Sequence, residues 1–538
     1  TVKDKTIQND TMNFIQNWLK KYFPDSKSDM FAVFIERCGQ MAKKNGYQAM
    51  ITQHSWMFLS SFEKLRTKLL AVDIVNMAHL GARAFEEIGG EVVQTTSFVI
   101  RKSHIADYKG EYCRLIEPTS QQGKEDMFLS GENRYAAVQS NFSKIPGSPV
   151  AYNFSEKVFR AFEAFKPLPE YGITRLGMTT ASNETFVRLW FEVEIRRCYL
   201  DATNAEQVLN AHLKWVPYNK GGLFRRWFGN MDCVVNWEND GYEIKHFGED
   251  TGHIRSTVPN TEYYFLECGT WSKISSGKIA VRYRPVGSIF DVAGACLYSQ
   301  NRTNLYLLIA FLNSNVAMKL LSVLSPTMNF EGGHISSLPI CIPDKNADYT
   351  TKVENCISIS KDDWDSYETS WDFKRNPLAP SAQALREQMD SQFVSSRMEK
   401  FGCINWHFEN WKQECEDRFQ QLKKNEEELN RIFIDIYGLQ DELTPDVADK
   451  DVTVHRVFDS KDDVPESMKG SNYVRTMRDE IVSLISYAVG CMFGRYSLDV
   501  EGLAYAGGEW DGSKYKTFIP DPDNCIPVTD EEYFRDDI

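Results

Sequence analysis

The fold of this chain is decided by residues 258–340, whose sequence is VPNTEYYFLECGTWSKISSGKIAVRYRPVGSIFDVAGACLYSQNRTNLYLLIAFLNSNVAMKLLSVLSPTMNFEGGHISSLPI. Its first half interleaves aromatic rings, hydroxyls and cations between turn-forming glycines. Cations and hydroxyls suit phosphate oxygens and flat rings suit bases, so this mixture favours a nucleic-acid surface. Its second half begins with an apolar run, residues 305–312, that predicts a buried helix.

A second segment with the same chemistry precedes it, PYNKGGLFRRWFGN at residues 217–230. Two adjacent glycines let the backbone approach a phosphate closely, and Lys220, Arg225 and Arg226 supply positive charge. The same residues also fit a surface hairpin whose arginines are solvated above an aromatic core. The residues alone favour neither interpretation.

Ten residues of these segments are candidate DNA contacts. Arginine pairs bidentately with guanine and asparagine with adenine, whereas lysine and serine suit phosphates and tryptophan suits stacking. The candidates are Lys220, Arg225, Arg226, Asn260, Trp271, Lys273, Ser275, Arg282, Arg284 and Asn329. The sequence does not decide which arginine reads a base and which holds a phosphate. An asparagine in a Pro-Asn turn is also more often a backbone cap.

The net charge of −14 is unevenly distributed along the chain. Residues 441–538 carry 10 Lys and Arg against 22 Asp and Glu, whereas residues 166–340 carry 17 against 16. A basic face is therefore compatible with the middle of the chain. The acidic end is expected to be a solvated surface, with a protein-docking surface as the alternative.

Length and composition bound the remaining possibilities. A chain of 538 residues is expected to form two to four domains. Its twelve cysteines form no C-x-x-C pair, so neither a metal site nor a disulfide framework is expected. No apolar run approaches the roughly 20 residues that span a bilayer, and no leader precedes the first helices. We therefore expect a cytoplasmic protein that makes no membrane contact.

The first hundred residues show helical and strand periods in alternation. Apolar spacing predicts helices within residues 1–45, one of them starting at Ser28-Asp29, and a further helix at residues 60–70. Strands are predicted at residues 47–52, 72–77 and 95–100. This order is that of the last part of an α/β methyltransferase sheet, although the pattern alone fits any doubly wound α/β domain.

Motif phrases along most of the chain resemble adenine-specific (N6) DNA methyltransferases, and in particular the PglX type of BREX phage-exclusion systems. Fused restriction-modification methyltransferases are related to these enzymes. The matching phrases lie at residues 28–37, 45–58, 62–70, 80–85, 177–193, 269–276, 282–291, 310–314 and 325–340.

The resemblance implies an α/β first part, an α+β target-recognition domain and a helical C-terminal region. Residues 1–105 would be the rear part of a class I methyltransferase sheet, and residues 106–165 a bridge. Residues 166–343 would be the target-recognition domain. Residues 344–440 would be helical, with a packed helical pair formed from the heptad-like stretch 382–437. Residues 441–538 would be an acidic region packing on the methyltransferase part.

The resemblance also implies site-specific methylation of adenine in double-stranded DNA, with S-adenosylmethionine as cofactor and the target base flipped out of the duplex. The family's Asn/Asp-Pro-Pro-Tyr/Phe motif and its glycine-rich cofactor turn do not occur in these 538 residues. We expect both upstream of Thr1, so that this chain alone is inactive. Phe85 matches the aromatic residue that packs against the flipped base, although a buried core position is the commoner fate of a phenylalanine.

Two alternatives stay open. The first is a fused type II restriction-modification enzyme with a nuclease upstream, and the second is a DNA-recognition subunit without catalysis. Double-stranded DNA is the expected partner in every case, and other phage-defence proteins are candidate partners.

Overall fold

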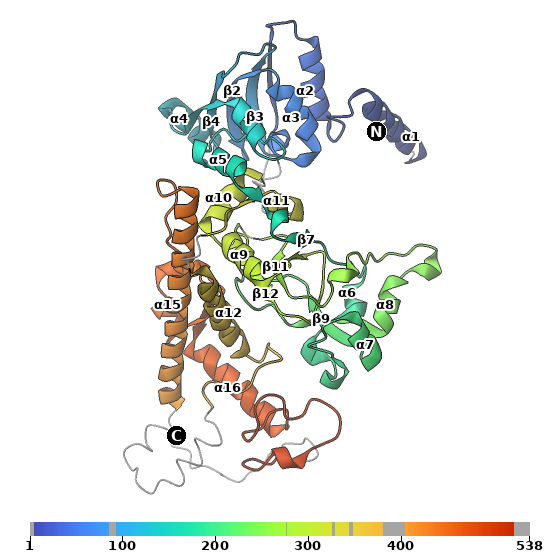
Figure 1. Ribbon diagram of the computed structural model, residues 1–538, viewed down its shortest axis with the longest axis vertical. Helices are drawn as coiled ribbons and strands as arrows, with labels where there is room; N and C mark the ends of the chain where they lie inside the picture. Colours follow the sequence, from blue (N-terminus) through green and yellow to red (C-terminus); the bar gives the residue numbers. More distant parts are fainter. Residues whose placement is uncertain are drawn as a thin grey trace.

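The computed structural model describes residues 5–85, 93–275, 277–324, 329–343, 348–379 and 404–520, and the side chains of residues 5–10 are not among them. A five-stranded sheet with its helices lies at one end of an elongated molecule (Figure 1). Two four-stranded sheets, two two-stranded sheets and a set of long helices form most of the remaining described residues. Ser276, residues 325–328 of the phrase 325–340, residues 382–403 of the heptad-like stretch and residues 521–538 lie outside the described residues.

The first helices form where the sequence predicts them. They are α1 (Lys5–Tyr22) and α2 (Met30–Met41). Asp29 caps α2, because its carboxylate accepts a hydrogen bond of 3.3 Å from the backbone N–H of Phe31. The predicted start at Ser28-Asp29 is thus confirmed.

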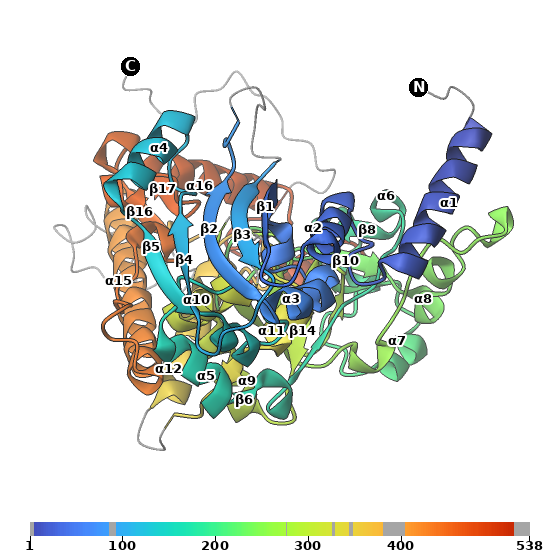
Figure 2. The same cartoon turned by 90° about the horizontal axis from the view of Figure 1, so that it is seen from above.

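The five-stranded sheet has the order β1-β3-β2-β4-β5. β3 is antiparallel to both β1 and β2, and β2 is parallel to β4. The carboxyl ends of β1, β2 and β4 therefore lie at one edge of the sheet, and α3 (Glu63–Leu70) connects β1 to β2. The strands are β1 (Tyr47–Gln53), β2 (Asp73–Gly81), β3 (Thr95–Arg101), β4 (Lys109–Arg114) and β5 (Arg134–Val138). The predicted helix and three strands are confirmed, and Figure 2 shows the sheet from above.

The sheet extends beyond residue 105, where the sequence analysis places a bridge. β4 and β5 belong to residues 106–165, together with α4 (Gln121–Ser130) and α5 (Glu156–Ala164). β4 has the sequence KGEYCR, which shows little strand periodicity. Gly110 also brings β4 so close to β2 that an added Cβ would collide with the backbone oxygen of Ile74. Close backbone approach, which leaves no hydrophobic signal, explains why this strand was missed.

The middle of the chain is built from two four-stranded sheets and two apolar helices. One sheet has the order β13-β9-β10-β8 and the other β12-β11-β14-β7. α9 (Arg302–Leu312) and α10 (Asn315–Leu324) supply most of the adjoining core, and every residue from Leu305 to Leu312 is buried. The strands are β7 (Ile173–Arg175), β8 (Val187–Leu189), β9 (Trp215–Asn219), β10 (Cys233–Asn236), β11 (Cys268–Ser272), β12 (Val281–Arg284), β13 (Ile289–Phe290) and β14 (Gly294–Tyr298).

In the part of the chain that the structure describes, no single helix is long and apolar enough to cross a membrane. α9 and α10 reach the required length and apolarity only when taken together, and they are bent by 74° at the break between them.

Two long helices flank the middle part. α12 (Tyr349–Asp365) packs against α15 (Ile404–Tyr437), a single helix of 34 residues. The helix that pairs with α15 therefore comes from residues 349–365 and not from the stretch 382–437, of which the structure describes residues 404–437. Gly438 follows α15 with φ 65°, a left-handed conformation that glycine adopts without strain.

α16 (Met477–Met492) lies elsewhere than the sequence analysis predicts for residues 441–538. It occupies the end of the molecule opposite the five-stranded sheet (Figure 1). Its Tyr487 packs against Phe373 and Tyr496, and its buried Glu480 accepts a hydrogen bond of 3.1 Å from Trp411 Nε1 of α15. Phe373 and Trp411 are more than 60 residues away from these partners in the sequence, and Tyr496 follows an irregular segment. The periodicity of apolar residues could therefore not indicate where α16 packs.

Buried ion pairs join the middle part to the long helices. Arg225 Nη2 lies 2.8 Å from Asp363 Oδ2 of α12, and Arg226 Nη1 lies 2.8 Å from Glu426 Oε2 of α15. Trp227 Nε1 donates a hydrogen bond of 2.6 Å to the same Glu426 carboxylate. Burial raises the pKa of Glu426, and Arg226 and Trp227 oppose that rise. Burial also acts to raise the pKa of Asp363, but His455 and Arg225 outweigh it and hold that pKa well below its usual value.

Replacing Glu426 by Gln should lower the free energy of unfolding by about 3 kcal/mol, because it leaves the buried Arg226 without a counter-charge. Glu428→Gln is the matched control on the same helix. Its carboxylate pairs with the half-exposed Lys352, so the loss should stay below about 1 kcal/mol. Denaturant unfolding measures the free energy of unfolding of both variants. Equal losses would show that the buried ion pair stabilises the protein no more than the half-exposed one.

A hydrogen-bonded histidine pair lies near the carboxyl ends of β1 and β2. His54 Nδ1 and His79 Nε2 are 2.8 Å apart, and His79 Nδ1 is 2.9 Å from the hydroxyl of Tyr152. Burial lowers the pKa of His54 to about 4. Burial, and then the charges of His54 and Arg114, lowers the pKa of His79 to about 3. Both imidazoles are therefore neutral at pH 7.

Acid should destabilise the protein through this pair. Unfolded histidine binds a proton near pH 6.5, whereas the folded pair resists protonation until about pH 4 and below. The stabilisation is thus complete above pH 6.5 and declines as the pH falls towards 4. The double variant His54→Gln/His79→Gln should show a flatter dependence of Tm on pH in this window. The control variant His253→Gln, at an exposed histidine, should keep the wild-type slope of Tm against pH. A wild-type slope in the double variant would show that the His54–His79 pair does not cause the loss of stability in acid.

Candidate nucleic-acid interface

The segment 217–230 lies along the hairpin formed by β11 and β12. The backbone N–H of Trp227 donates to Val281 O at 3.0 Å, and the N–H of Tyr283 donates to Trp227 O at 2.7 Å. Gly221 and Gly222 have φ values of 87° and 122°, and a Cβ on Gly221 would lie 3.0 Å from the backbone oxygen of Ala293. The two glycines therefore let the chain turn tightly against the start of β14, whereas the sequence analysis expected them to approach a phosphate.

The structure buries the side chains of all four predicted arginine contacts, so none of them offers a guanidinium on the protein surface. Arg225, Arg226, Arg282 and Arg284 are between 1% and 4% exposed. Arg225 and Arg226 pair with carboxylates of α12 and α15, more than 130 residues further along the chain. Arg284 donates to Ser288 Oγ and to Asn230 O, at 3.0 and 3.4 Å. The sequence could not indicate that partners so distant would draw these cations inside.

Trp271 is a core residue and not a stacking platform. Its side chain is fully buried, and its Nε1 donates a hydrogen bond of 2.9 Å to Phe330 O. The ring fills the space between β11 and the segment that precedes α11 (Gly332–Ser336). Its prediction as a DNA contact is therefore corrected.

The other polar candidates are partly exposed and fall into two places. Lys273 and Asn329 converge at the tip of the β11–β12 hairpin, where Lys273 Nζ lies 3.0 Å from Glu331 Oε1 and Asn329 Nδ2 donates to the same oxygen at 3.0 Å. Ser275 lies at the same tip and donates to Lys278 O at 2.6 Å. Asn260 lies apart from them.

Asn260 occupies the N-cap position of a short 3-10 helix at Thr261–Tyr263, but its side chain makes no capping hydrogen bond to that helix. Its φ is 56°, and its Nδ2 donates to Leu176 O at 2.9 Å. Lys220 is half-buried beside the two glycines of the segment 217–230. The structure thus brings Lys273, Ser275 and Asn329 together, and places Asn260 elsewhere.

Phe85 is not a core residue. It follows β2 by four residues and is 40% exposed, so the commoner fate of a phenylalanine does not apply to it. Its role against a base stays a prediction.

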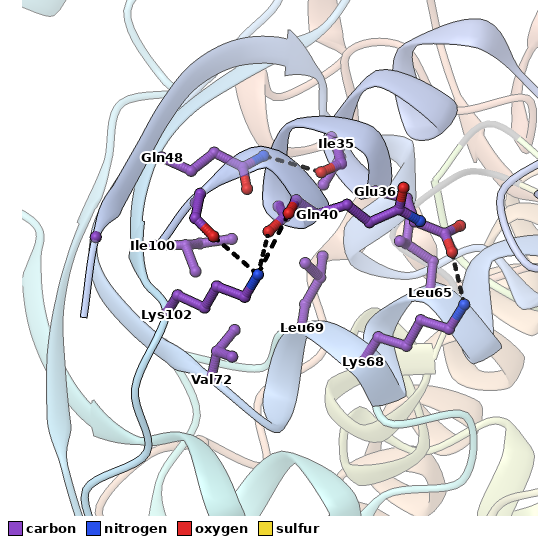
Figure 3. Close-up of a pocket in the computed structure, with 13 residues that line it drawn as sticks. Ile35, Glu36, Gln40, Gln48, Leu65, Lys68, Leu69, Val72, Ile100 and Lys102 are labelled. Carbon is purple, nitrogen blue, oxygen red and sulfur yellow. Dashed lines mark hydrogen bonds and ion pairs between the residues drawn. The ribbon is translucent and has the colours of Figure 1, made fainter. Parts of the chain in front are cut away.

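A cavity of about 310 Å³ lies between α2, α3 and the five-stranded sheet (Figure 3). Its polar side chains are already engaged. Lys102 Nζ donates to the backbone oxygens of Gly39 and Ala42 at 3.0 and 2.9 Å, and Gln48 Nε2 donates to Ile35 O at 3.0 Å. Lys68 Nζ lies 2.7 Å from Glu36 Oε1. This cavity therefore offers apolar walls and no convergent free polar group.

A second cavity, of about 230 Å³, lies at the carboxyl edge of the sheet. His79, Arg114 and Tyr152 line it from the first part of the chain, and Ser322 lines it from α10. Ligands of open α/β sheets bind at this edge, so the position is one where a ligand would meet both parts of the chain. Neither His79 nor Tyr152 belongs to a recognisable motif, so the sequence alone carries no signal for them.

A third cavity, of about 210 Å³, lies between residues 222–224 and the β11–β12 hairpin. Ser272, Ile274, Ser275, Ala280 and Arg282 complete its lining. Two residues predicted as DNA contacts, Ser275 and Arg282, therefore meet in it. Among the described residues, no group of three or more His, Cys, Asp and Glu is arranged to hold a metal ion.

Comparison with known proteins finds one matching family model and two similar methyltransferases. Residues 2–85 match the Eco57I restriction-modification methylase model. The chain is 45% identical over 531 residues to the adenine-specific methyltransferase PglX of Lacticaseibacillus casei (strain Zhang). It is 34% identical over 538 residues to the adenine-specific methyltransferase BrxX of Escherichia coli O9:H4 (strain HS). Each alignment covers 97% of this chain and 41% of the relative, so the chain spans less than half the length of these relatives.

Among solved structures, the type IIL restriction-modification enzyme MmeI, solved in complex with DNA, superposes with a TM-score of 0.46 and 11% identity. The superposition covers 80% of this chain and 53% of that one. The sequence comparisons confirm the resemblance that the motif phrases indicated: along nearly its whole length, this chain is homologous to a part of the PglX-type adenine-specific methyltransferases.

Proposed function

We propose that this chain is the DNA-recognition portion, together with part of the catalytic domain, of a site-specific adenine-N6 DNA methyltransferase that acts in phage defence. The 45% identity to PglX over 531 residues carries the proposal. Proteins this similar over such a length share their architecture, and the relatives are named as adenine-specific methyltransferases. The target adenine would be flipped out of the duplex, since its amino group is otherwise enclosed in the base stack.

The five-stranded sheet would be the rear of the methyltransferase sheet. Support comes from β1, which lies at the edge of the sheet and pairs only with β3 among the described strands. One face of β1 is also uncovered, because Tyr47 and Ile51 are 64% and 57% exposed. α/β sheets are normally covered on both faces, and open apolar edges are rare in finished folds. Further strands and helices of the same domain would complete this side.

Apolar side chains of α1 and α2 extend the uncovered surface. Phe14, Trp18, Phe34 and Met41 are all exposed, and in Figure 2 both helices lie on the β1 side of the sheet. Several exposed apolar side chains on one side of a domain mark an interaction site. The remaining portion of the methyltransferase domain is the partner that the homology favours.

S-adenosylmethionine would bind to that remaining portion. The carboxyl-edge cavity and the 310 Å³ cavity do not fit this cofactor. The cavity at the carboxyl edge has no Asp or Glu in its lining to accept hydrogen bonds from ribose hydroxyls, and Glu36 of the 310 Å³ cavity is paired with Lys68. The chain's own contribution would be Phe85 and the carboxyl-edge cavity on the base side, and the hairpin tip around Lys273 and Ser275 on the DNA side.

Methyl transfer should require more than this chain. Joined to the portion of the methyltransferase domain that we expect upstream of it, the chain should transfer tritium from methyl-labelled S-adenosylmethionine to adenine N6 of duplex DNA, whereas the chain alone should not. The cofactor should also leave the Tm of the isolated chain unchanged. Transfer by the isolated chain, or a clear rise in its Tm, would contradict the proposed division. DNA cleavage by the joined protein would instead favour the fused restriction enzyme.

Ile51→Lys should block association between this chain and a separately produced preceding portion, because it places a charge on the uncovered face of β1. The Tm of the isolated variant should change little, since Ile51 is exposed. Leu129→Lys, an exposed substitution on α4 at the other edge of the sheet, is the control and should associate normally. Co-purification measures the association of both variants. If Ile51→Lys associates as well as wild type, the preceding portion does not pack on the uncovered face of β1.

A further inference from the structure

The 210 Å³ cavity beside the β11–β12 hairpin encloses an arginine without a counter-charge. Arg282 is 1% exposed, and its Nη1 donates to Arg225 O at 3.2 Å. Its Nε and Nη2 have no hydrogen-bond partner in the part of the chain that the structure describes. Burial, and then the neighbouring charge of Arg284, lowers the pKa of Arg282 to about 10, so the guanidinium is still charged at neutral pH.

The contrast with its neighbours makes this arginine unusual. Arg225 and Arg226 each pair with a buried carboxylate, whereas no described Asp or Glu forms an ion pair with Arg282. A buried charge without a partner is costly, so such a group usually meets a ligand of opposite charge. Its two unpaired donor atoms match the paired oxygens of an anion such as phosphate.

The rest of the cavity also favours an anion. Residues 222–224 line it, and their backbone N–H groups donate no hydrogen bond to another described residue. Ser272 and Ser275 already donate to the carbonyls of Gly222 and Lys278, so the donors left for a ligand are Arg282 and the backbone. No carboxylate lines the cavity. A nucleobase would also need hydrogen-bond acceptors and a stacking partner, and Phe224 is the one aromatic ring in this lining.

We propose that this cavity binds a phosphate group of the DNA backbone, with Arg282 as its buried anchor. The inference rests on the proposed function for its ligand, and on the unpaired guanidinium for its position. Leu223 and Ile274 stand at the mouth, 68% and 77% exposed, where they would contact the sugars that flank the phosphate. Arg282 would thus hold a phosphate from the interior of the protein, which is one of the two roles that the sequence left open for the arginines.

Three variants of the full chain separate binding from folding. Arg282→Gln removes the anchor directly. Ser275→Glu keeps it and places a carboxylate in the lining of the cavity, where it would pair with Arg282 and compete with phosphate. Ser143→Glu is the matched control, because Ser143 is an exposed serine whose hydroxyl likewise donates to a carbonyl, that of Ser140.

Two titrations at constant ionic strength test the proposal. Inorganic phosphate should raise the Tm of wild type and of Ser143→Glu saturably, and should leave Arg282→Gln and Ser275→Glu unchanged. Ser275→Glu should itself melt higher than wild type without phosphate. A labelled DNA duplex should bind Ser275→Glu at least tenfold more weakly than Ser143→Glu, with a salt dependence reduced by about one phosphate contact.

The possible failures are distinguishable. Equal phosphate shifts in wild type and Ser275→Glu, with DNA binding unchanged, would overturn the cavity as a site and leave the proposed function standing. A second possible result is that phosphate raises the Tm of wild type but not of Ser275→Glu, while the wild-type chain binds no duplex. This result would overturn the DNA backbone as the ligand and leave free phosphate in its place. That second result would also count against the DNA-recognition role proposed for the chain.

Discussion

The structure depends on two buried ion pairs that begin from adjacent residues. Arg225 and Arg226 lie in the segment 217–230, and they reach Asp363 of α12 and Glu426 of α15 respectively. A carboxylate buried this deeply persists only when its charge is met and its oxygens are hydrogen-bonded. Trp227 meets the second requirement at Glu426, and His455 meets it at Asp363. The small sheets and the long helices are therefore held together by charge as well as by apolar packing.

This arrangement explains why part of the sequence analysis succeeded and part failed. Strands β1, β2 and β3 and helices α2, α3, α9 and α15 are local features, set by apolar period and capping residues such as Asp29. They could be predicted from the chain alone. β4 could not, because its place depends on the approach of Gly110 to a strand some 35 residues earlier.

The site residues divide along the same line. Asn260 and Phe85 stay partly exposed, as a surface contact requires, and the Asn260 side chain donates to Leu176 O. The four arginines do not, because their burial depends on carboxylates or backbone oxygens contributed by other elements. An arginine in the sequence indicates affinity for an anion, but not which anion it meets. Only the tertiary structure shows that Arg226 pairs with Glu426, whereas Arg282 meets no carboxylate in the described chain.

The position of the salt-bridged arginines has a consequence for protein engineering. If residues 166–343 recognise DNA as proposed, transplanting them between homologues would be the simplest route to a new DNA specificity. A graft with those boundaries would carry Arg225 and Arg226 but leave Asp363 and Glu426 behind in the host. Each mismatch would strand a charge in the interior at a cost of about 3 kcal/mol. The natural unit of exchange therefore extends through the end of α15 at Tyr437.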